Sequence, residues 1–420
     1  MARAESATST AAGSVSRRST TRIRPINRAS RLQCYGPARP TRRRPSTSFT
    51  RGDAVKALRL AALATLVWSA FPAEDAPAPT GDTIVDPSAR FELLYTRPET
   101  EAGGLTESPA VAPDGSIYFS DILRGENHGR IHRFDPATKQ VETFAANSHK
   151  SNGLTFGPDG HLYAAEGADH GGRRISRWNV ETKQRDLVVD NFGGKRFNSP
   201  NDITSDDAGN LYFTDPRYVG HEPRELQWRA VYRVTPRGDV VEVTHDVTKP
   251  NGLALSPDGR TLYVAETNNG GDGMPGVEPG NRGPMRVYAF PLGADGLVSG
   301  PRRLFHDFGP EFGCDGMTVD EHGNVYLTAR EPSKPGILVL DPSGEQIAFL
   351  PTSTGVHEEE TPFTENEKKA LDEPPVPPSG LPSNVEFGLG EGANVLYVTV
   401  DQSLYRIRLK VRGFHRQHRR

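Results

Sequence analysis

The stretch Asn152-Gly-Leu-Thr-Phe-Gly-Pro-Asp-Gly-His-Leu-Tyr-Ala-Ala, residues 152–165, decides the fold. Short β-prone runs flank its Pro-Asp-Gly segment, which is typical of a tight turn between two antiparallel strands. The segment recurs five more times with drift, and in every copy a Gly in or just after the turn lies eight residues after a carboxylate or an Asn. The six polar residues are Glu107, Asn152, Asn201, Asn251, Asp315 and Asn384, and the six glycines are Gly115, Gly160, Gly209, Gly259, Gly323 and Gly392.

The spacing of the copies indicates the architecture. Successive glycines are 45, 49, 50, 64 and 69 residues apart, and further strand-like runs between the copies, such as 130–134 and 174–178, give each unit about four strands. Propeller blades repeat with a period of about 40–50 residues. The sequence therefore predicts an all-β, six-bladed β-propeller with four-stranded blades. We expect run 90–95 to pair with run 403–409 and close the ring, because this pairing removes a free sheet edge.

Composition and charge agree with a turn-rich β protein. The 420 residues include 43 Gly and 35 Pro, and 35% of the chain is hydrophobic. The formal net charge of −3 hides an asymmetry, since residues 1–50 carry eleven Arg and one Glu, whereas residues 74–409 carry 31 basic and 51 acidic residues. An acidic body argues against nucleic acid as a partner.

The amino-terminal region is interpreted separately from the propeller. Residues 1–54 are rich in Arg and Ser without apolar periodicity, so we expect a disordered leader upstream of the true start. Residues 55–73 resemble a secretory signal peptide, which predicts export to the periplasm or the extracellular space. A transit peptide or an uncleaved anchor are the alternatives, although the apolar run is short for a stable membrane span. Cys34 falls in the leader, so Cys314 has no disulfide partner within the mature domain.

The rest of the chain divides into a linker, the propeller with one insertion, and a tail. Residues 74–88 form a linker, residues 89–409 form the propeller, and residues 410–420 form a basic tail. A charged and then Pro-rich insertion at 356–381 precedes the last blade. It is interpreted either as a flap over the channel mouth or as a solvated loop.

The six polar residues predict a metal site. The innermost strand of each blade lines the channel of a propeller, so side chains at one phase of the repeat converge. Two carboxylates and four amides form an all-oxygen set, which is what Ca²⁺ prefers. No Cys or His occupies the phase, which disfavours zinc there. Asn before Gly is also common in turns, but turn chemistry does not require Glu107 or Asp315.

The chain also resembles a known family. Its motifs Asn198-Ser-Pro-Asn-Asp-Ile, Leu211-Tyr-Phe-Thr-Asp-Pro, Lys249-Pro-Asn-Gly-Leu-Ala-Leu-Ser-Pro-Asp-Gly and Cys314-Asp-Gly-Met-Thr-Val-Asp are similar to those of the gluconolactonase and regucalcin (senescence marker protein) family, over roughly residues 90–408. The resemblance implies a Ca²⁺-type ion held by Glu107, Asn251 and Asp315, with Asn201 as a further ligand or substrate contact. It also implies hydrolysis of a small-molecule lactone.

The expected chemistry needs a metal to polarise the ester carbonyl and a carboxylate to activate water. Asp315 is the first candidate for the base. Coordination would lower its pKa and weaken it as a base, so Asp215 and His170 are alternatives. Asp215 could instead cap a turn, and His170 could be a surface-loop residue.

Substrate contacts rest on the resemblance. Arg196 resembles the family's Arg that meets sugar-lactone oxygens, although its spacing to Asn201 is longer than in the animal members, and Asn198 is the alternative contact. Asn152 and Asn384 complete the channel as a polar wall. A non-catalytic propeller that binds sugar or protein, with a structural Ca²⁺, is the competing function. The sequence gives neither the lactone nor the oligomeric state.

Overall fold

The computed structural model describes residues 76–98, 101, 103–123, 125–274, 276–354 and 380–418. All of them belong to the compact unit Trp68–Arg420. The leader, the signal peptide and nearly all of insertion 356–381 lie outside the described residues, so these assignments and the expected export stay predictions. Among the described residues, no helix has the length and hydropathy needed to cross a bilayer.

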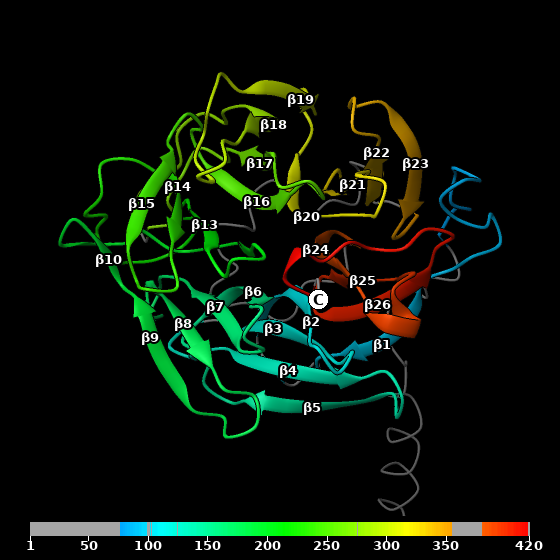
Figure 1. Ribbon diagram of the computed structural model, residues 1–420, viewed down its shortest axis with the longest axis horizontal. Coiled ribbons are helices and arrows are strands. Elements are labelled where there is room, and N and C mark those ends of the chain that lie inside the picture. Colours follow the sequence, from blue (N-terminus) through cyan, green and yellow to red (C-terminus); the bar gives the residue numbers. More distant parts are fainter. Residues whose placement is uncertain are drawn as a thin grey trace, which may run out of the picture. The chain divides into compact units, whose positions relative to one another are not determined.

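Six antiparallel sheets of four strands form a six-bladed β-propeller, as predicted (Figure 1). The first three blades consist of β2 (Gly103–Val111), β3 (Ile117–Leu123), β4 (Arg130–Asp135) and β5 (Gln140–Ala145); β6 (Ser151–Phe156), β7 (Leu162–Glu166), β8 (Arg174–Trp178) and β9 (Arg185–Val189); and β12 (Ile203–Ser205), β13 (Leu211–Asp215), β14 (Ala230–Val234) and β15 (Val240–Thr244). A short hairpin, β10 (Asn191–Phe192) and β11 (Lys195–Arg196), precedes β12.

The other three blades continue around the ring. They consist of β16 (Pro250–Leu255), β17 (Thr261–Thr267), β18 (Met285–Pro291) and β19 (Arg303–Asp307); β20 (Cys314–Val319), β21 (Val325–Ala329), β22 (Gly336–Leu340) and β23 (Gln346–Pro351); and β24 (Pro382–Phe387), β25 (Val395–Val400), β26 (Ser403–Arg408) and β1 (Glu92–Thr96). The first strand of each blade contacts the first strands of its neighbours, so these six strands line the channel. Two 3₁₀ helices, η4 (Gly390–Gly392) and η5 (Arg416–His418), are the described helical elements.

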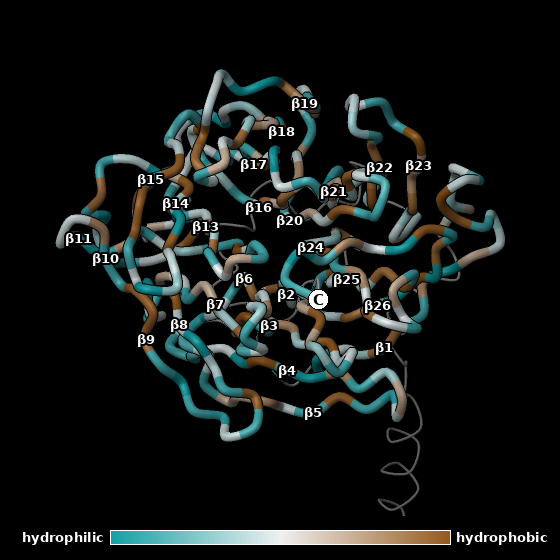
Figure 2. Tube along the Cα trace, in the orientation of Figure 1, coloured by the Kyte–Doolittle hydropathy of each residue, from teal (hydrophilic) through white to brown (hydrophobic). Residues whose placement is uncertain are grey.

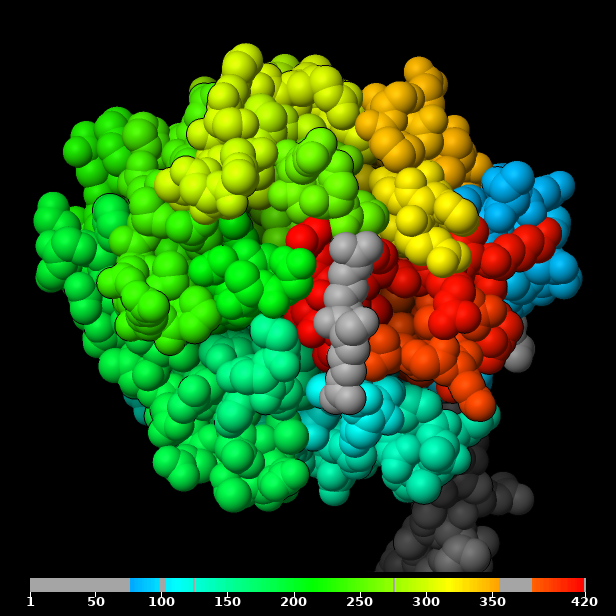
Figure 3. Space-filling view, in the orientation of Figure 1, coloured from blue at the N-terminus to red at the C-terminus, as the bar shows by residue number. Residues whose placement is uncertain are grey.

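The ring closes by the predicted pairing of the chain's two ends. β1 lies antiparallel to β26, with Glu92 opposite Arg406 and Thr96 opposite Ser403. Arg97, which follows β1, forms a buried ion pair with Asp121 of β3 and so ties blade six to blade one. Figure 3 shows the C-terminal residues in red beside the cyan residues of blade one.

The turn signature behaves as predicted in five copies of the repeat. The glycines of these copies, from Gly115 to Gly323, have φ between +71° and +84°, a left-handed conformation that favours glycine. In the weakest copy, Gly392 does not adopt a positive φ and ends the 3₁₀ helix η4 instead.

Apolar side chains fill the spaces between blades. Hydrophobic stretches lie mostly along the strands (Figure 2). Phe119 and Phe134 of blade one, for example, pack with Tyr397 and Leu404 of blade six in one buried cluster. Burial of each such side chain contributes about 1.5–3 kcal/mol, so the contacts between blades stabilise the ring.

The segments on either side of the propeller also pack against it. Ile84 and Val85, in the segment interpreted as a linker, are buried in a cluster between blades five and six. Residues 410–418 run across one end of the channel, near the centre of the ring (Figure 1). There the Arg416 guanidinium donates to Pro257 O at 2.9 Å, and His418 Nε2 donates to Val111 O at 3.1 Å.

Candidate functional site

The inner strands are irregular where they carry the predicted ligands. Strand pairing shifts register between Glu107 and Ala110, Ser151 and Leu154, Pro250 and Leu253, Cys314 and Met317, and Pro382 and Asn384. In blade three, Asn201 precedes β12. Such bulges re-aim side chains and are frequent beside functional sites. They allow two successive residues of one strand to approach the channel.

A glycine follows each of Asn152, Asn251 and Asp315. These three glycines explain how closely the inner strands of adjacent blades approach each other. Gly153, Gly252 and Gly316 lie within strands and lack the positive φ of turn glycines. A Cβ at Gly153 would overlap Asn201 O, one at Gly252 would overlap Asp315 O, and one at Gly316 would overlap the Asn384 amide. Turn chemistry therefore does not account for these Asn-Gly and Asp-Gly pairs. They bring the polar residue of the next blade close.

Asn251 and Asp315 contact each other directly. Asn251 Nδ2 donates to Asp315 Oδ1 at 2.7 Å, and Arg330 Nη1 donates to Asp315 Oδ2 at 2.9 Å. The Oδ1 atom of Asn251 is buried without any hydrogen-bond partner. Burial raises the pKa of Asp315, and the Arg330 charge opposes this shift.

Glu107 adds a second buried carboxyl group to this site. Burial raises its pKa well above the ordinary value, and the neighbouring Asp315 carboxylate raises it further. The unpaired Asn251 oxygen and the two acids suit a hard divalent cation, which takes six to eight oxygen ligands. The oxygen ligands that Glu107, Asn251 and Asp315 offer thus fit the predicted Ca²⁺-type ion.

The sequence did not identify Asp202 as a site residue, although its carboxylate contacts residues of three other blades. It belongs to blade three, but Asp202 Oδ2 accepts from Leu253 N of blade four at 3.0 Å. Its Oδ1 atom lies 3.4 Å from both Ser108 Oγ of blade one and Asn384 Nδ2 of blade six. Burial raises the pKa of Asp202 to about 7. The available signal was Asn201-Asp202, which stands where three other copies have Asn-Gly or Asp-Gly.

A small cavity continues the channel toward the end that the C-terminal residues cover. Its volume is about 50 Å³, which is room for a few waters. Asp202, Asn384 and Glu386 line the cavity together with His415 and Arg416. Ligand pockets usually occupy about 300–1,000 Å³, so this end does not accommodate a sugar-sized molecule.

Asp215 and Asn198 have structural partners. Asp215 is fully buried, and its two carboxylate oxygens accept from Asn198 N at 2.7 Å and Ser199 N at 2.6 Å. Asn198 Nδ2 donates to Asp215 O at 3.2 Å and Trp228 O at 3.0 Å. Burial raises the pKa of Asp215 to about 7. Both residues thereby hold the segment that leads into Asn201.

The remaining predicted residues fall into two groups, one in the inner segments of the blades and one exposed to solvent. Asn152 and Asn201 are partly buried in adjacent inner segments, where Gly153 N donates to Asn201 O at 2.6 Å. Arg196, in β11, and His170, on the loop after β7, are exposed, and the Arg196 guanidinium donates to Gly172 O in the loop that carries His170. No hydrogen bond described for Arg196 or His170 reaches the channel ligands.

Comparison with known proteins identifies the family. Residues 105–356, which include the predicted ligands from Glu107 to Asp315, match the family model of the SMP-30/gluconolactonase/LRE-like region. The chain belongs to this family. The sequence motifs predicted the same family.

Relatives within the SMP-30/gluconolactonase/LRE-like family include named enzymes. A gluconolactonase of Zymomonas mobilis is 34% identical over 299 residues, which are 66% of this chain and 77% of the relative. Lactonohydrolase oryH of Aspergillus oryzae is 23% identical over 350 residues, covering 65% of this chain and 72% of the relative.

Two solved structures are similar to this chain in fold. A gluconolactonase from Xanthomonas campestris is 25% identical with a TM-score of 0.60, over 81% of this chain and 96% of that one. A regucalcin from Agrobacterium tumefaciens, described as a calcium-binding protein, is 20% identical with a TM-score of 0.54, over 77% of this chain and 95% of that one.

Proposed function

We propose that this protein is a divalent-cation-dependent lactonase that opens a sugar lactone in the central channel. The observation that carries the proposal is the buried, unpaired Oδ1 atom of Asn251 beside the carboxyl groups of Glu107 and Asp315. Named gluconolactonases and lactonases among its relatives support lactone hydrolysis. Calcium is the proposed cation because the donors are oxygens.

The cation would be held by Glu107, Asn251 and Asp315, with Asn201 as a further ligand. When bound, it would supply a Lewis acid for the ester carbonyl and the developing oxyanion. Asp315 is the proposed base because its side chain is 15% exposed, whereas Asp215 is fully buried. Arg330 holds Asp315 Oδ2 and fixes the orientation of the carboxylate.

The substrate is proposed to enter from the end opposite the C-terminal residues. Arg416 and His418 cover one end, and the cavity beneath Asp202 is too small for a sugar lactone. The inner strands begin at the other end, where Arg196 and Asn198 lie on the segments that precede Asn201. Arg196 remains a proposed substrate contact at that rim.

The test is hydrolysis of glucono-δ-lactone by the full chain, followed by pH-stat, before and after removal of divalent cations with a chelator. We expect activity to disappear with the cation and to return with added Ca²⁺. Asp315→Asn and Glu107→Gln should each reduce kcat/KM by at least about 100-fold, whereas Glu321→Gln, at an exposed turn, should leave it unchanged.

Two outcomes would contradict the proposal. Full activity in the chelated protein would exclude dependence on the cation. Cation binding by a folded protein that hydrolyses none of a panel of lactones would favour the competing function, a non-catalytic propeller with a structural Ca²⁺.

A further inference from the structure

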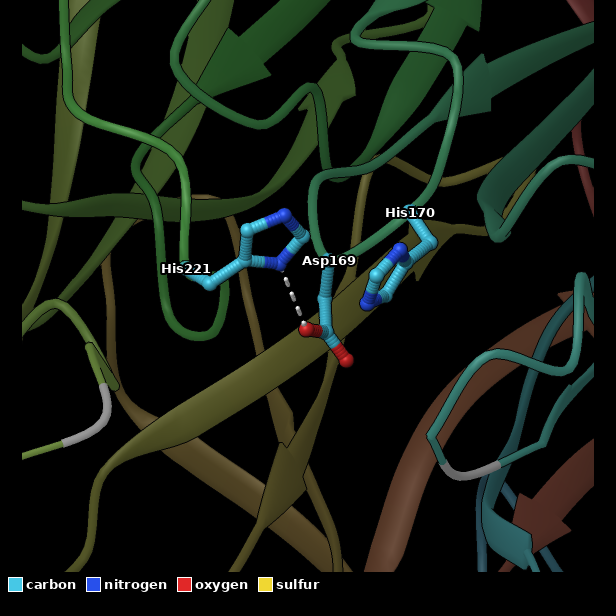
Figure 4. A group of neighbouring side chains, drawn as sticks. All are labelled: Asp169, His170 and His221. Carbon is cyan, nitrogen blue, oxygen red and sulfur yellow. Dashed lines mark hydrogen bonds and ion pairs between the residues drawn. The ribbon is translucent and has the colours of Figure 1, made fainter. Parts of the chain in front are cut away.

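A second group of metal-ligating side chains lies outside the channel ring. Asp169, His170 and His221 each offer one ligand atom, and these atoms all lie within 4.8 Å of one another. Asp169 Oδ1 is 3.4 Å from His221 Nδ1, and the two imidazole centroids are 4.2 Å apart. Figure 4 shows the carboxylate of Asp169 between the two rings. The three side chains converge without either ring being buried.

Two loops from neighbouring blades provide these residues. Asp169 and His170 follow β7 in blade two, and His221 lies between β13 and β14 in blade three. Ser151, next to Asn152, pairs with Glu166 at the end of β7. The loop after β7 therefore begins level with the channel ligands, at the end of the propeller that the C-terminal residues leave free.

The backbone that carries two of the ligands is fixed by the loop that carries the third. Asp169 and His170 adopt left-handed φ values of +60° and +66°. The Glu222 carboxylate accepts from both of their N–H groups, at 3.1 and 3.2 Å. Arg217 donates to Glu222 O and lies 3.6 Å from Glu222 Oε2. The ligand positions are thus set by contacts that do not use the ligand atoms.

We propose that Asp169, His170 and His221 bind a first-row transition metal of the Zn²⁺ class. Imidazole nitrogens suit Zn²⁺, Ni²⁺ and Cu²⁺, whereas Ca²⁺ requires oxygen ligands. Three protein ligands are the number found in zinc sites that keep a position open for water. The site differs in ligand chemistry from the all-oxygen ring, and a metal there links the loops of blades two and three.

The charges that face the site are Lys150, Glu222 and Arg217. Lys150 Nζ lies 3.9 Å from Asp169 Oδ2 and donates to Leu123 O at 2.6 Å and Gly125 O at 2.8 Å. Glu222 already pairs with Arg217 and two N–H groups. Lys150 offsets part of the Asp169 charge, so binding depends on the two imidazoles, and loss of either one should be decisive.

The experiment titrates the full chain with Co²⁺ in the presence of excess Ca²⁺, which is added to compete for the proposed oxygen site, and follows the visible absorption of Co²⁺. Zn²⁺ is then added in competition. We expect the wild type to bind one equivalent with visible absorption that Zn²⁺ displaces. His170→Ala and His221→Ala should each weaken binding by at least about tenfold, with unchanged far-UV circular dichroism.

His322→Ala is the matched control, because His322 is 64% exposed on the β20–β21 turn, far along the chain from both loops, and should bind Co²⁺ like the wild type. Absence of visible absorption in the wild type, or equal Co²⁺ affinity in the two ligand variants and the wild type, would overturn the site. Neither readout uses lactone hydrolysis, so failure here would leave the proposed function untouched.

Discussion

Asn251 shows what a single side chain contributes to the channel. Its amide nitrogen is committed to Asp315, while its amide oxygen is buried with no partner. An unsatisfied buried polar atom costs about 1–3 kcal/mol, and such atoms in native proteins call for an explanation. A cation ligated by this oxygen would supply the missing interaction. Binding of the cation at Asn251 would then both stabilise the fold and complete the proposed active site.

Glu386 and His415 lie next to each other beside the small cavity, and their pKa values are shifted in opposite directions. Their closest charged atoms, Glu386 Oε1 and His415 Nδ1, are 3.7 Å apart. Burial raises the pKa of Glu386 to about 7 and lowers the pKa of His415 to about 4. The folded state therefore favours a protonated acid next to a neutral imidazole.

Both groups should affect stability as a function of pH. Between pH 4.5 and about 7 the folded state binds more protons at Glu386 than the unfolded state, so this group lowers the free energy of unfolding as pH rises. Glu386→Gln should gain up to about 3 kcal/mol over the wild type across that window. At His415 the unfolded state binds more protons between about pH 4 and 6.5, so His415→Gln should lose stability relative to the wild type as pH rises.

Urea unfolding at several pH values between 4.5 and 7.5 measures both differences. Curves for the two variants that stay parallel to the wild-type curve would contradict the assigned protonation states.

The inner strands determine which parts of the site could be read from the sequence. Their alternation and turn glycines predicted the blades and the polar ring. The bulges did not appear in the pattern, because a shift of register leaves no distinctive residue type. Without the bulge in blade one, Ser108 would point away from the channel. Asp202 was overlooked because it precedes β12, where the alternation of a regular strand does not apply. The loop partners of Asp215 and His170 were likewise invisible, since loop conformation follows from contacts far apart in the chain.

Gly252 tests the close approach of adjacent inner strands. Gly252→Ala should lower the free energy of unfolding by at least about 2 kcal/mol, because its Cβ would overlap the backbone oxygen of Asp315. Gly392→Ala is the matched control, since a Cβ there meets nothing within 4 Å and φ is not positive. Denaturant unfolding of the three proteins provides the comparison. Equal stability of the two alanine variants would show that blades four and five are less tightly packed than described.

At the scale of the whole molecule, the C-terminal residues cover one end of the channel. The sequence predicted only a basic tail after residue 409, because its Lys, Arg and His residues do not indicate which surface of the propeller the tail contacts. In the structure Val411 and His415 are buried, and Arg416 reaches Asp207 of blade three and Pro257 of blade four. The tail therefore cross-links blades that are not its sequence neighbours.

Removal of the tail should separate stability from activity. A chain that ends at Lys410 should unfold at least about 3 °C lower and retain lactone hydrolysis within about threefold, because the proposed substrate entrance is at the opposite end. Arg412→Ala, at an exposed position in the same segment, serves as the control. Thermal circular dichroism and the pH-stat assay measure the two effects. A folded truncated chain without hydrolysis would place the substrate at the covered end.

The pairing of β1 with β26 has a consequence for biosynthesis. Residues 92–96 leave the ribosome long before their partners at 403–408. Blades one to five therefore form an open arc with an unpaired edge until residues 403–408 have been made. The hydrogen bond that Asn384 of blade six donates to Ser108 of blade one can form only then, so closure of the ring is a late step of folding.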